Sequence, residues 1–168
     1  MDSHKKWVRK VNYLWIFAIG ILVGFILGIV CISCFMIRDI KRKSELAYKQ
    51  SSVVQMLNKW LLHKQKGNSI ADYLYDKGYH EIAVYGMNYL GERLIDDLLE
   101  SKIKVSYVID KNAKCPYPNI LACTPNDSLK KVDAIIVSIN YLFDEINIEL
   151  SERVDYPIIN LEELLFDM

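Results

Sequence analysis

The sequence contains few of the residues that most catalytic and metal sites need. It has three histidines and four cysteines in 168 residues, and none of them belongs to a cluster with metal-ligand spacing. Cys31 and Cys34 lie in an apolar run, whereas Cys115 and Cys123 lie in the more polar second half. We therefore predict no metal site, no self-contained catalytic site, and unpaired thiols of the kind found in a reducing compartment.

Charge is absent from one long stretch and unequally divided over the rest. No charged residue lies between Lys10 and Arg38, and the formal net charge of the chain is zero. Residues 1–66 carry 12 Lys and Arg against 3 Asp and Glu, whereas residues 67–168 carry 9 against 18. An acidic second half argues against nucleic acid as a partner, and a basic first half suits a position close to anionic lipid.

The uncharged stretch predicts a transmembrane helix over residues 14–37. Twenty-four helical residues span about 36 Å, which exceeds the ~30 Å hydrocarbon core of a bilayer. Trp7, Tyr13 and Trp15 stand where an interfacial aromatic belt is expected. The alternatives are a cleaved signal peptide, which would have a shorter apolar core, and a lipoprotein anchor at Cys34, which lacks small residues before it. A single-pass membrane protein is the prediction.

Glycines recur within this apolar segment at every fourth position. Gly20, Gly24 and Gly28 fall on one face of a helix, where small residues let a second helix approach closely. This glycine-zipper pattern predicts a homo-oligomer or a partner helix in the membrane. The alternative is the general enrichment of glycine in membrane helices.

The basic residues on both sides of the segment suggest its orientation. The C-terminal flank has slightly more Lys and Arg than the N-terminal flank, which favours a cytoplasmic C-terminal domain. The expected location is therefore the cell membrane, with the domain in the cytoplasm.

Four regions follow from these patterns. They are a basic flank at 1–13, the transmembrane helix at 14–37, a basic amphipathic juxtamembrane helix or linker at 38–68, and a domain at 69–168. Within the third, residues 44–66 place most of their apolar side chains on one side of a helix. That helix could lie on the membrane, pair in a short coiled coil, or act as a connector whose Trp60 and Leu61 dock on the domain.

Residues 69–168 alternate short apolar runs with amphipathic segments, which is typical of an α/β fold. We expect strands at 82–85, 103–109, 120–122, 133–138 and 158–159. We expect helices at 69–78, 90–99, 129–131, 142–152 and 161–166. Right-handed crossovers then predict a parallel sheet of about five strands in the order 3-2-1-4-5.

The first strand–helix–strand unit contains the candidate binding turn. Gly86 lets the chain reverse directly after the first strand, and Gly91 lets the helix pack closely on the sheet. Asn88 stands between them, and the free amides of the helix N-terminus favour an anion. Asp110 ends the second strand, where a carboxylate can accept ribose hydroxyls. The alternative is that both glycines serve packing and that Asp110 caps a loop.

The candidate cofactor-binding residues follow from the topology. The carboxyl ends of the first and fourth strands meet at one edge of the sheet, so we expect Ser138 and Asn140 to face the turn. The full candidate set is Gly86, Met87, Asn88, Tyr89, Leu90, Gly91, Asp110, Lys111, Ser138 and Asn140.

The stretch IAVYGMNYLGERLIDDL…IKVSYVIDKN, followed by VDAIIVSI, resembles the Rossmann-like domain of bacterial membrane-associated proteins related to nucleoside-diphosphate-sugar epimerases and dehydratases. The resemblance covers about residues 69–165, and Asn88 stands where that family usually has glycine. It implies binding of a nucleotide, of a dinucleotide such as NAD(P), or of a nucleotide-sugar, in surface polysaccharide biosynthesis. Two alternatives remain: a ligand-free scaffold protein, and an NAD(P)-linked sugar-nucleotide enzyme that needs a partner to complete its site.

Overall fold

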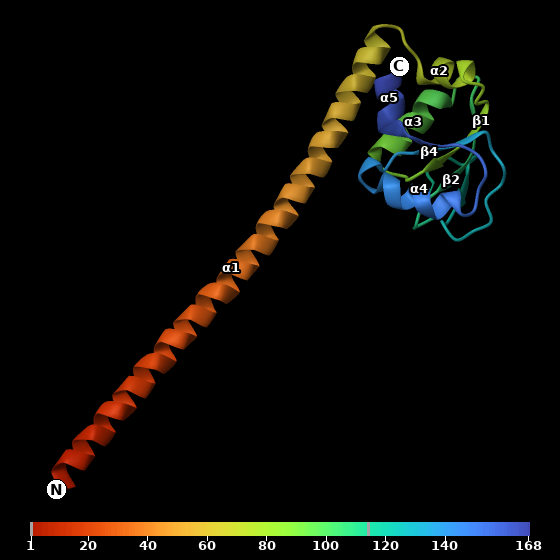
Figure 1. Ribbon diagram of the computed structural model, residues 1–168. Coiled ribbons are helices and arrows are strands. Elements are labelled where there is room, and N and C mark those ends of the chain that lie inside the picture. Colours follow the sequence, from red (N-terminus) through yellow and green to blue (C-terminus); the bar gives the residue numbers. More distant parts are fainter. Residues whose placement is uncertain (1, 114) are drawn as a thin grey trace. The chain divides into compact units, whose positions relative to one another are not determined.

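The computed structural model describes the backbone of residues 2–113 and 115–168 (Figure 1). It describes the side chains of residues 15, 20–22, 24–113 and 115–168. The chain forms two compact units, one reaching to Tyr48 and the other extending from Lys49 to Met168.

The first unit is helical throughout its described residues and belongs to α1 (Asp2–Gln65). From Gly20 onward this helix has an 18-residue window with a mean hydropathy of 2.7, and none of that window is buried. It is therefore long and apolar enough to cross a membrane. The faces of Gly20, Gly24 and Gly28 are open, with nothing within 4 Å of an added Cβ. Of the predicted aromatic belt, the side chains of Trp7 and Tyr13 lie outside the described residues.

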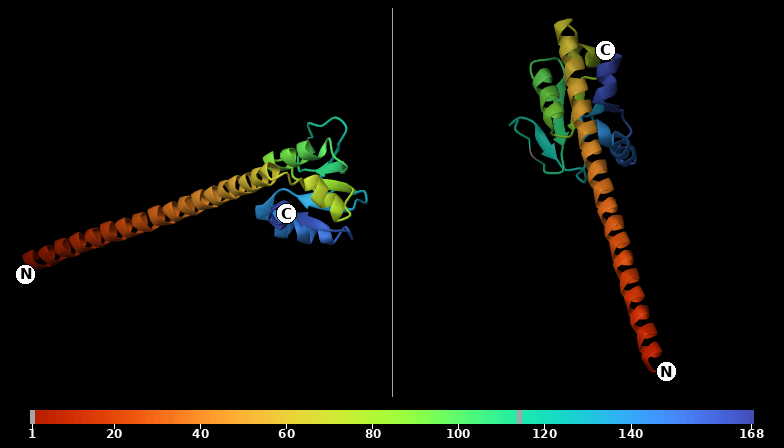
Figure 2. Two further views of the ribbon diagram at one scale, coloured as in Figure 1. Left: turned by 90° about the horizontal axis from the view of Figure 1, so that it is seen from above. Right: turned by 90° about the vertical axis from the view of Figure 1, so that its left-hand side faces the viewer.

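The second unit begins inside α1, earlier than the boundary at residue 69 predicted from the sequence. Residues 49–65 of α1 pack on the domain, and Met56 and Trp60 are buried in its core. The last turns lie between two later helices, because Trp60 Nε1 donates to Asp97 and His63 Nε2 lies 3.0 Å from the Leu165 carbonyl (Figure 2). Of the two residues expected to dock, Trp60 does so, whereas Leu61 stays exposed.

The domain contains a five-stranded parallel sheet in the order β3-β2-β1-β4-β5, which confirms the predicted order. The central strand β1 (Glu81–Tyr85) lies between β2 (Lys104–Ile109) and β4 (Ala134–Val137). The edges are β3 (Leu121–Cys123) and β5 (Ile158–Asn160), of three residues each. The central strands are apolar on both sides because helices and loops cover both faces.

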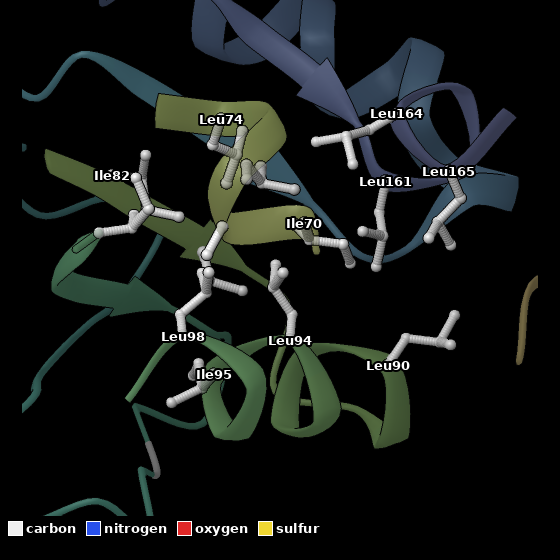
Figure 3. Packing of buried hydrophobic residues seen from close by; sticks show 14 of the residues in the cluster. Ile70, Leu74, Ile82, Leu90, Leu94, Ile95, Leu98, Leu161, Leu164 and Leu165 are labelled. Atoms are coloured by element: carbon white, nitrogen blue, oxygen red, sulfur yellow. The ribbon is translucent and has the colours of Figure 1, made fainter. Parts of the chain in front are cut away.

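Helices cover the two faces unequally. On one face, α2 (Ile70–Asp76), α3 (Tyr89–Leu98), α5 (Leu161–Asp167) and residues 49–65 of α1 form the larger core. Figure 3 shows side chains of α2, α3 and α5 meeting there. On the other face lies α4 (Phe143–Ser151), preceded by a 3-10 turn, η1 (Asn140–Leu142). The turn after β1 therefore lies between the larger helical layer, formed by α2, α3, α5 and residues 49–65 of α1, and the smaller layer, formed by η1 and α4.

The apolar face of α3 follows the three- and four-residue spacing of a helix. Leu90, Leu94, Ile95 and Leu98 are all buried, whereas Leu99 is 56% exposed. The helix ends at Leu98, and the next residue lies a further 100° around the axis, away from the sheet. Leu99 therefore does not belong to the buried face, although the helix expected at 90–99 includes it.

The prediction of a helix at 129–131 is wrong, because these residues are not helical. Thr124 and Asp127 instead close a turn: the Asp127 amide donates to the Thr124 carbonyl at 3.1 Å, and the Asp127 carboxylate accepts from the Thr124 amide at 2.6 Å. Residues that suit a helix N-terminus also suit an isolated turn, and here the turn leads directly towards β4.

The Asp133 side chain, directly before β4, accepts hydrogen bonds from the start of β1, and the contribution of these bonds to stability should depend on pH. Its Oδ2 accepts from the amides of Glu81 and His80, each at 2.8 Å, and these bonds hold the pKa of the carboxyl below its usual range. A lowered pKa adds stability above the unfolded value of about 3.9, and this stability is lost as pH falls through the folded value.

Asp133→Asn should therefore reduce the free energy of unfolding by about 1 kcal/mol at pH 7. The difference from wild type should shrink as pH falls below the unfolded value of about 3.9 and through the lowered folded value. Urea unfolding of the full-length protein in detergent, followed by circular dichroism at several pH values, measures both. A difference that does not change with pH would contradict the assigned role.

Candidate functional site

The turn between β1 and α3 requires glycine at both predicted positions. Gly86 has φ +98°, a conformation that side chains with a Cβ rarely adopt. A Cβ on Gly86 would lie 2.5 Å from Ile139 Cγ1, and one on Gly91 would lie 2.1 Å from the Gly86 carbonyl oxygen. The close approach of α3 to the turn thus depends on both residues.

Asn88 occupies the N-terminus of α3 with its own side chain. Its Oδ1 accepts from the amides of Leu90 and Gly91 at 2.9 and 3.0 Å, and its Nδ2 donates to the Ser138 carbonyl at 3.3 Å. These amides are the groups that a bound phosphate would use. An amide oxygen of the chain therefore stands where a phosphate oxygen would have to enter.

Asp110 also bonds to the backbone around it. Its Oδ2 accepts from the Met87 amide at 3.1 Å, and its Oδ1 accepts from the Asn112 amide at 2.9 Å. Each carboxylate oxygen has a further lone pair, so Asp110 can hold the turn and still accept from a ligand hydroxyl.

Ser138 reaches the turn as predicted, whereas Asn140 points elsewhere. Ser138 is buried, and its hydroxyl lies 2.8 Å from the Gly86 carbonyl oxygen, to which it donates. Asn140 Nδ2 instead donates to Ser52 of α1 and, at 3.1 Å, to Glu162 of α5. Asn140 therefore links the domain to α1 and takes no part in the turn.

The remaining candidates differ in accessibility. Leu90 and Gly91 are buried, Met87 is half-buried, and Tyr89 is exposed at the first position of α3. Lys111 follows Asp110 at the rim of a neighbouring hollow. The structure thus gathers the six turn residues with Asp110 and Ser138, places Lys111 beside them, and leaves Asn140 outside the group.

A hollow of about 320 Å³ lies at the carboxyl ends of β1, β2 and β4, on the α4 side of the sheet. Tyr85 and Asp110 contribute to it from the strands, and Glu145 and Glu149 from α4. Tyr85 is only 4% exposed, and its hydroxyl has no hydrogen-bond partner among the described residues. An unpaired phenol next to several carboxylates can both donate to and accept from a ligand.

The Tyr85 hydroxyl is protonated at neutral pH, as an ordinary tyrosine is, and the surroundings of the hollow favour that form further. Burial raises the pKa of this hydroxyl, and the nearby carboxylates of Glu149 and Asp110 raise it further. At neutral pH the hollow therefore presents a hydroxyl donor within an acidic lining, which suits hydroxyl-bearing groups better than phosphates.

Tyr85, Glu145 and Glu149 were not identified from the sequence. Two weak signals pointed to them: Tyr85 is the last residue of the central strand, and the two glutamates lie four positions apart on one helix face. Neither signal tells which face of the sheet the helix covers.

No family model matches this chain, and neither the curated proteins nor the solved structures give a match. The arrangement defines an α/β domain with a crevice at the carboxyl edge of a parallel sheet.

Proposed function

We propose that this protein is a membrane-anchored, Rossmann-like module that binds the nucleoside or sugar part of a nucleotide-type ligand. The observation that carries the proposal is the hollow at the carboxyl edge of the sheet, into which the hydroxyl of the otherwise buried Tyr85 opens without a partner among the described residues. In open α/β sheets, ligands bind at this edge, where the strand order reverses on either side of β1.

The lining indicates which part of the ligand enters. Asp110, Glu145 and Glu149 can accept hydrogen bonds from hydroxyls, but they repel phosphates. The amides of α3 already bond to Asn88. A ribose or hexose therefore enters the hollow, and the phosphates remain outside it near Lys111. NAD(P) and nucleotide-sugars both contain such a part.

The biological setting rests on the sequence. The resemblance to proteins of surface polysaccharide biosynthesis favours a nucleotide-sugar. The apolar part of α1 is the proposed single membrane span, and the charge bias of its flanks, with the free thiols of Cys115 and Cys123, supports a cytoplasmic domain.

The test is isothermal titration of the full-length protein in detergent with NAD, NADP, UDP-sugars and coenzyme A. Tyr85→Phe removes only the hydroxyl and should weaken binding about fivefold, the value of one neutral hydrogen bond. Glu149→Gln should also weaken it, because the carboxylate lines the same hollow. Tyr75→Phe, on α2 and outside the hollow, is the matched control and should bind as wild type does. No binding by wild type would overturn the proposal.

Asn88→Gly tests whether a diphosphate can reach the turn. The change frees the amides of Leu90 and Gly91 while removing a cap that glycine replaces at a cost of only a few tenths of a kcal/mol. Dinucleotides should therefore bind more tightly to the variant, whereas a nucleoside without phosphates should bind equally to both proteins. An equal affinity for dinucleotides would show that the diphosphate does not contact this turn.

A ligand-free scaffold is the second candidate, and one observation favours it. The groups that were predicted to bind a diphosphate form hydrogen bonds with one another instead. Asn88 accepts from the α3 amides, Asp110 accepts from the Met87 amide, and Ser138 donates to the Gly86 carbonyl. If neither wild type nor Asn88→Gly binds any nucleotide, these bonds serve stability alone and the scaffold function stands.

A further inference from the structure

The domain-packed part of α1 has an apolar stripe that no described residue covers. Val54, Leu57 and Leu61 recur at spacings of three and four, and they are 64%, 38% and 55% exposed. On another side of the same helix, Met56 and Trp60 are buried in the domain core. This segment therefore has two apolar sides, and the domain accounts for only one of them.

The charges around the stripe do not favour a lipid surface as its occupant. Lys59 Nζ lies 5.0 Å from the centre of the Phe166 ring, and Lys64 forms an ion pair with Asp97. These lysines contact the domain itself, whereas a helix that lies on a membrane uses its basic residues to contact anionic lipid.

A groove of about 370 Å³ runs beside the stripe, between α1 and α3. Leu57 and Leu61 line one wall, and Arg93, Asp96 and Asp97 line the other. Lys64 pairs with Asp97 and Arg93 pairs with Asp96, so the charges along the groove cancel. The groove can therefore face a copy of itself without net repulsion, as an interface with two-fold symmetry requires.

We propose that a second copy of this chain docks on the stripe, so that residues 49–65 of the two copies pair as a short, parallel, two-stranded coiled coil. In heptad terms, Val54 and Leu61 take position a and Leu57 takes position d. A β-branched residue at a with leucine at d, as at Val54 and Leu57, suits two parallel strands. The polar Asn58, next to the stripe, then faces the groove of the partner.

The pairing rests on the membrane anchoring proposed above. Three side chains bury too little apolar surface to offset the entropy that two free molecules lose on association. Anchors confine both copies to one plane in one orientation, and this raises their effective concentration. The pair should therefore form in membranes and dissociate when the protein is diluted in detergent.

Disulfide cross-linking of the full-length protein in its own membranes tests the proposal. In a variant without the four native cysteines, Leu57→Cys and Leu61→Cys should each give a covalent dimer under mild oxidation, because cysteines facing each other meet the short Cβ–Cβ distance that a disulfide needs. Gln55→Cys, exposed on the same helix but away from the stripe, is the control and should give at least about fivefold less dimer.

Equal yields at positions 55 and 57, or no dimer at all, would overturn the proposal. A product with the mass of a different protein would also overturn it, because the stripe would then bind another partner. As a second variant, Leu57→Glu should abolish cross-linking at Leu61→Cys, whereas Gln55→Glu should leave it unchanged. Both glutamates are on exposed positions, so unaltered thermal unfolding of the domain shows that folding is preserved.

Alkaline extraction of the membranes keeps this test separate from the proposed function. A protein that stays in the membrane but does not cross-link contradicts only the pairing. A protein that is extracted contradicts the anchoring, and the nucleotide titrations are independent of both results.

Discussion

Gly91→Ala should destabilise the domain by about 3 kcal/mol or more and lower its melting temperature by about 10 °C. The new Cβ would lie 2.1 Å from the Gly86 carbonyl oxygen and 3.2 Å from Ser138 Oγ, and the first of these is a backbone atom that cannot rotate away. To relieve the contact, α3 must move off the turn, and Leu90, Leu94 and Leu98 would lose packing in the core.

Thermal unfolding of the full-length protein, followed by near-ultraviolet circular dichroism, measures this effect. Gly67→Ala is the control, because Gly67 has φ +78° but nothing within 4 Å of an added Cβ. Its cost should be only that of backbone conformation, about 1 kcal/mol. If the two variants unfold within a few degrees of each other, the contact of α3 with the turn is not the constraint that selects glycine at position 91.

Trp60→Ala should cost about 3–5 kcal/mol, the usual range for removing a large aromatic side chain from a core. The indole is buried beside Met56, and its Nε1 donates to Asp97 at 2.9 Å. The loss should loosen residues 49–65 from the domain, so trypsin should cleave after Lys59 and Lys64 at lower protease concentration than in wild type.

The controls for Trp60→Ala separate volume from hydrogen bonding. Trp60→Phe keeps most of the apolar volume and loses the bond to Asp97, so it should cost only about 1–2 kcal/mol. Leu62→Ala truncates a side chain that is 43% exposed and should cost about 0.5 kcal/mol or less. Unchanged stability and proteolysis of Trp60→Ala would show that the domain is complete without α1.

The order of the sheet could be predicted because local patterns determine it. Strands β1 and β4 are short apolar runs, and each is followed by a segment with helical spacing, so the chain has few ways to connect them. The earlier start of the domain could not be predicted in the same way. Trp60 is an aromatic residue on a basic amphipathic helix, a pattern that suits membrane contact equally well. Its burial in the domain core and its bond to Asp97 on α3 show that it docks on the domain.

The turn was predicted correctly in its backbone and incompletely in its side chains. Gly86 and Gly91 are constrained by local geometry, which the sequence expresses directly. Local structure also explains Asn88, because asparagine is a favoured N-cap residue and Asn88 caps α3. Comparing this position only with the glycine of the family's turn does not predict the cap. Asn140 follows β4 by three residues, and the 3-10 turn that begins there directs its side chain towards Ser52 and Glu162.

The hollow depends on relationships between distant residues, and these are hardest to infer from sequence. Tyr85 lies at the end of β1, and Glu149 is 64 positions later on α4. Their proximity follows from α4 packing on the face of the sheet opposite α3. A strand of four or five residues that is buried on both sides is apolar throughout. Its sequence therefore does not tell which side chains point to which face of the sheet.

The short outer strands affect how densely copies of this protein could be packed. A sheet with long bare edges offers a template on which neighbouring molecules extend one another's hydrogen bonding into a polymer. Here β3 and β5 present only three residues each, and Pro157, directly before β5, lacks the amide proton that such an extension would use. The protein could thus be concentrated on a surface without strand-to-strand aggregation, and contact between molecules would fall to its helices.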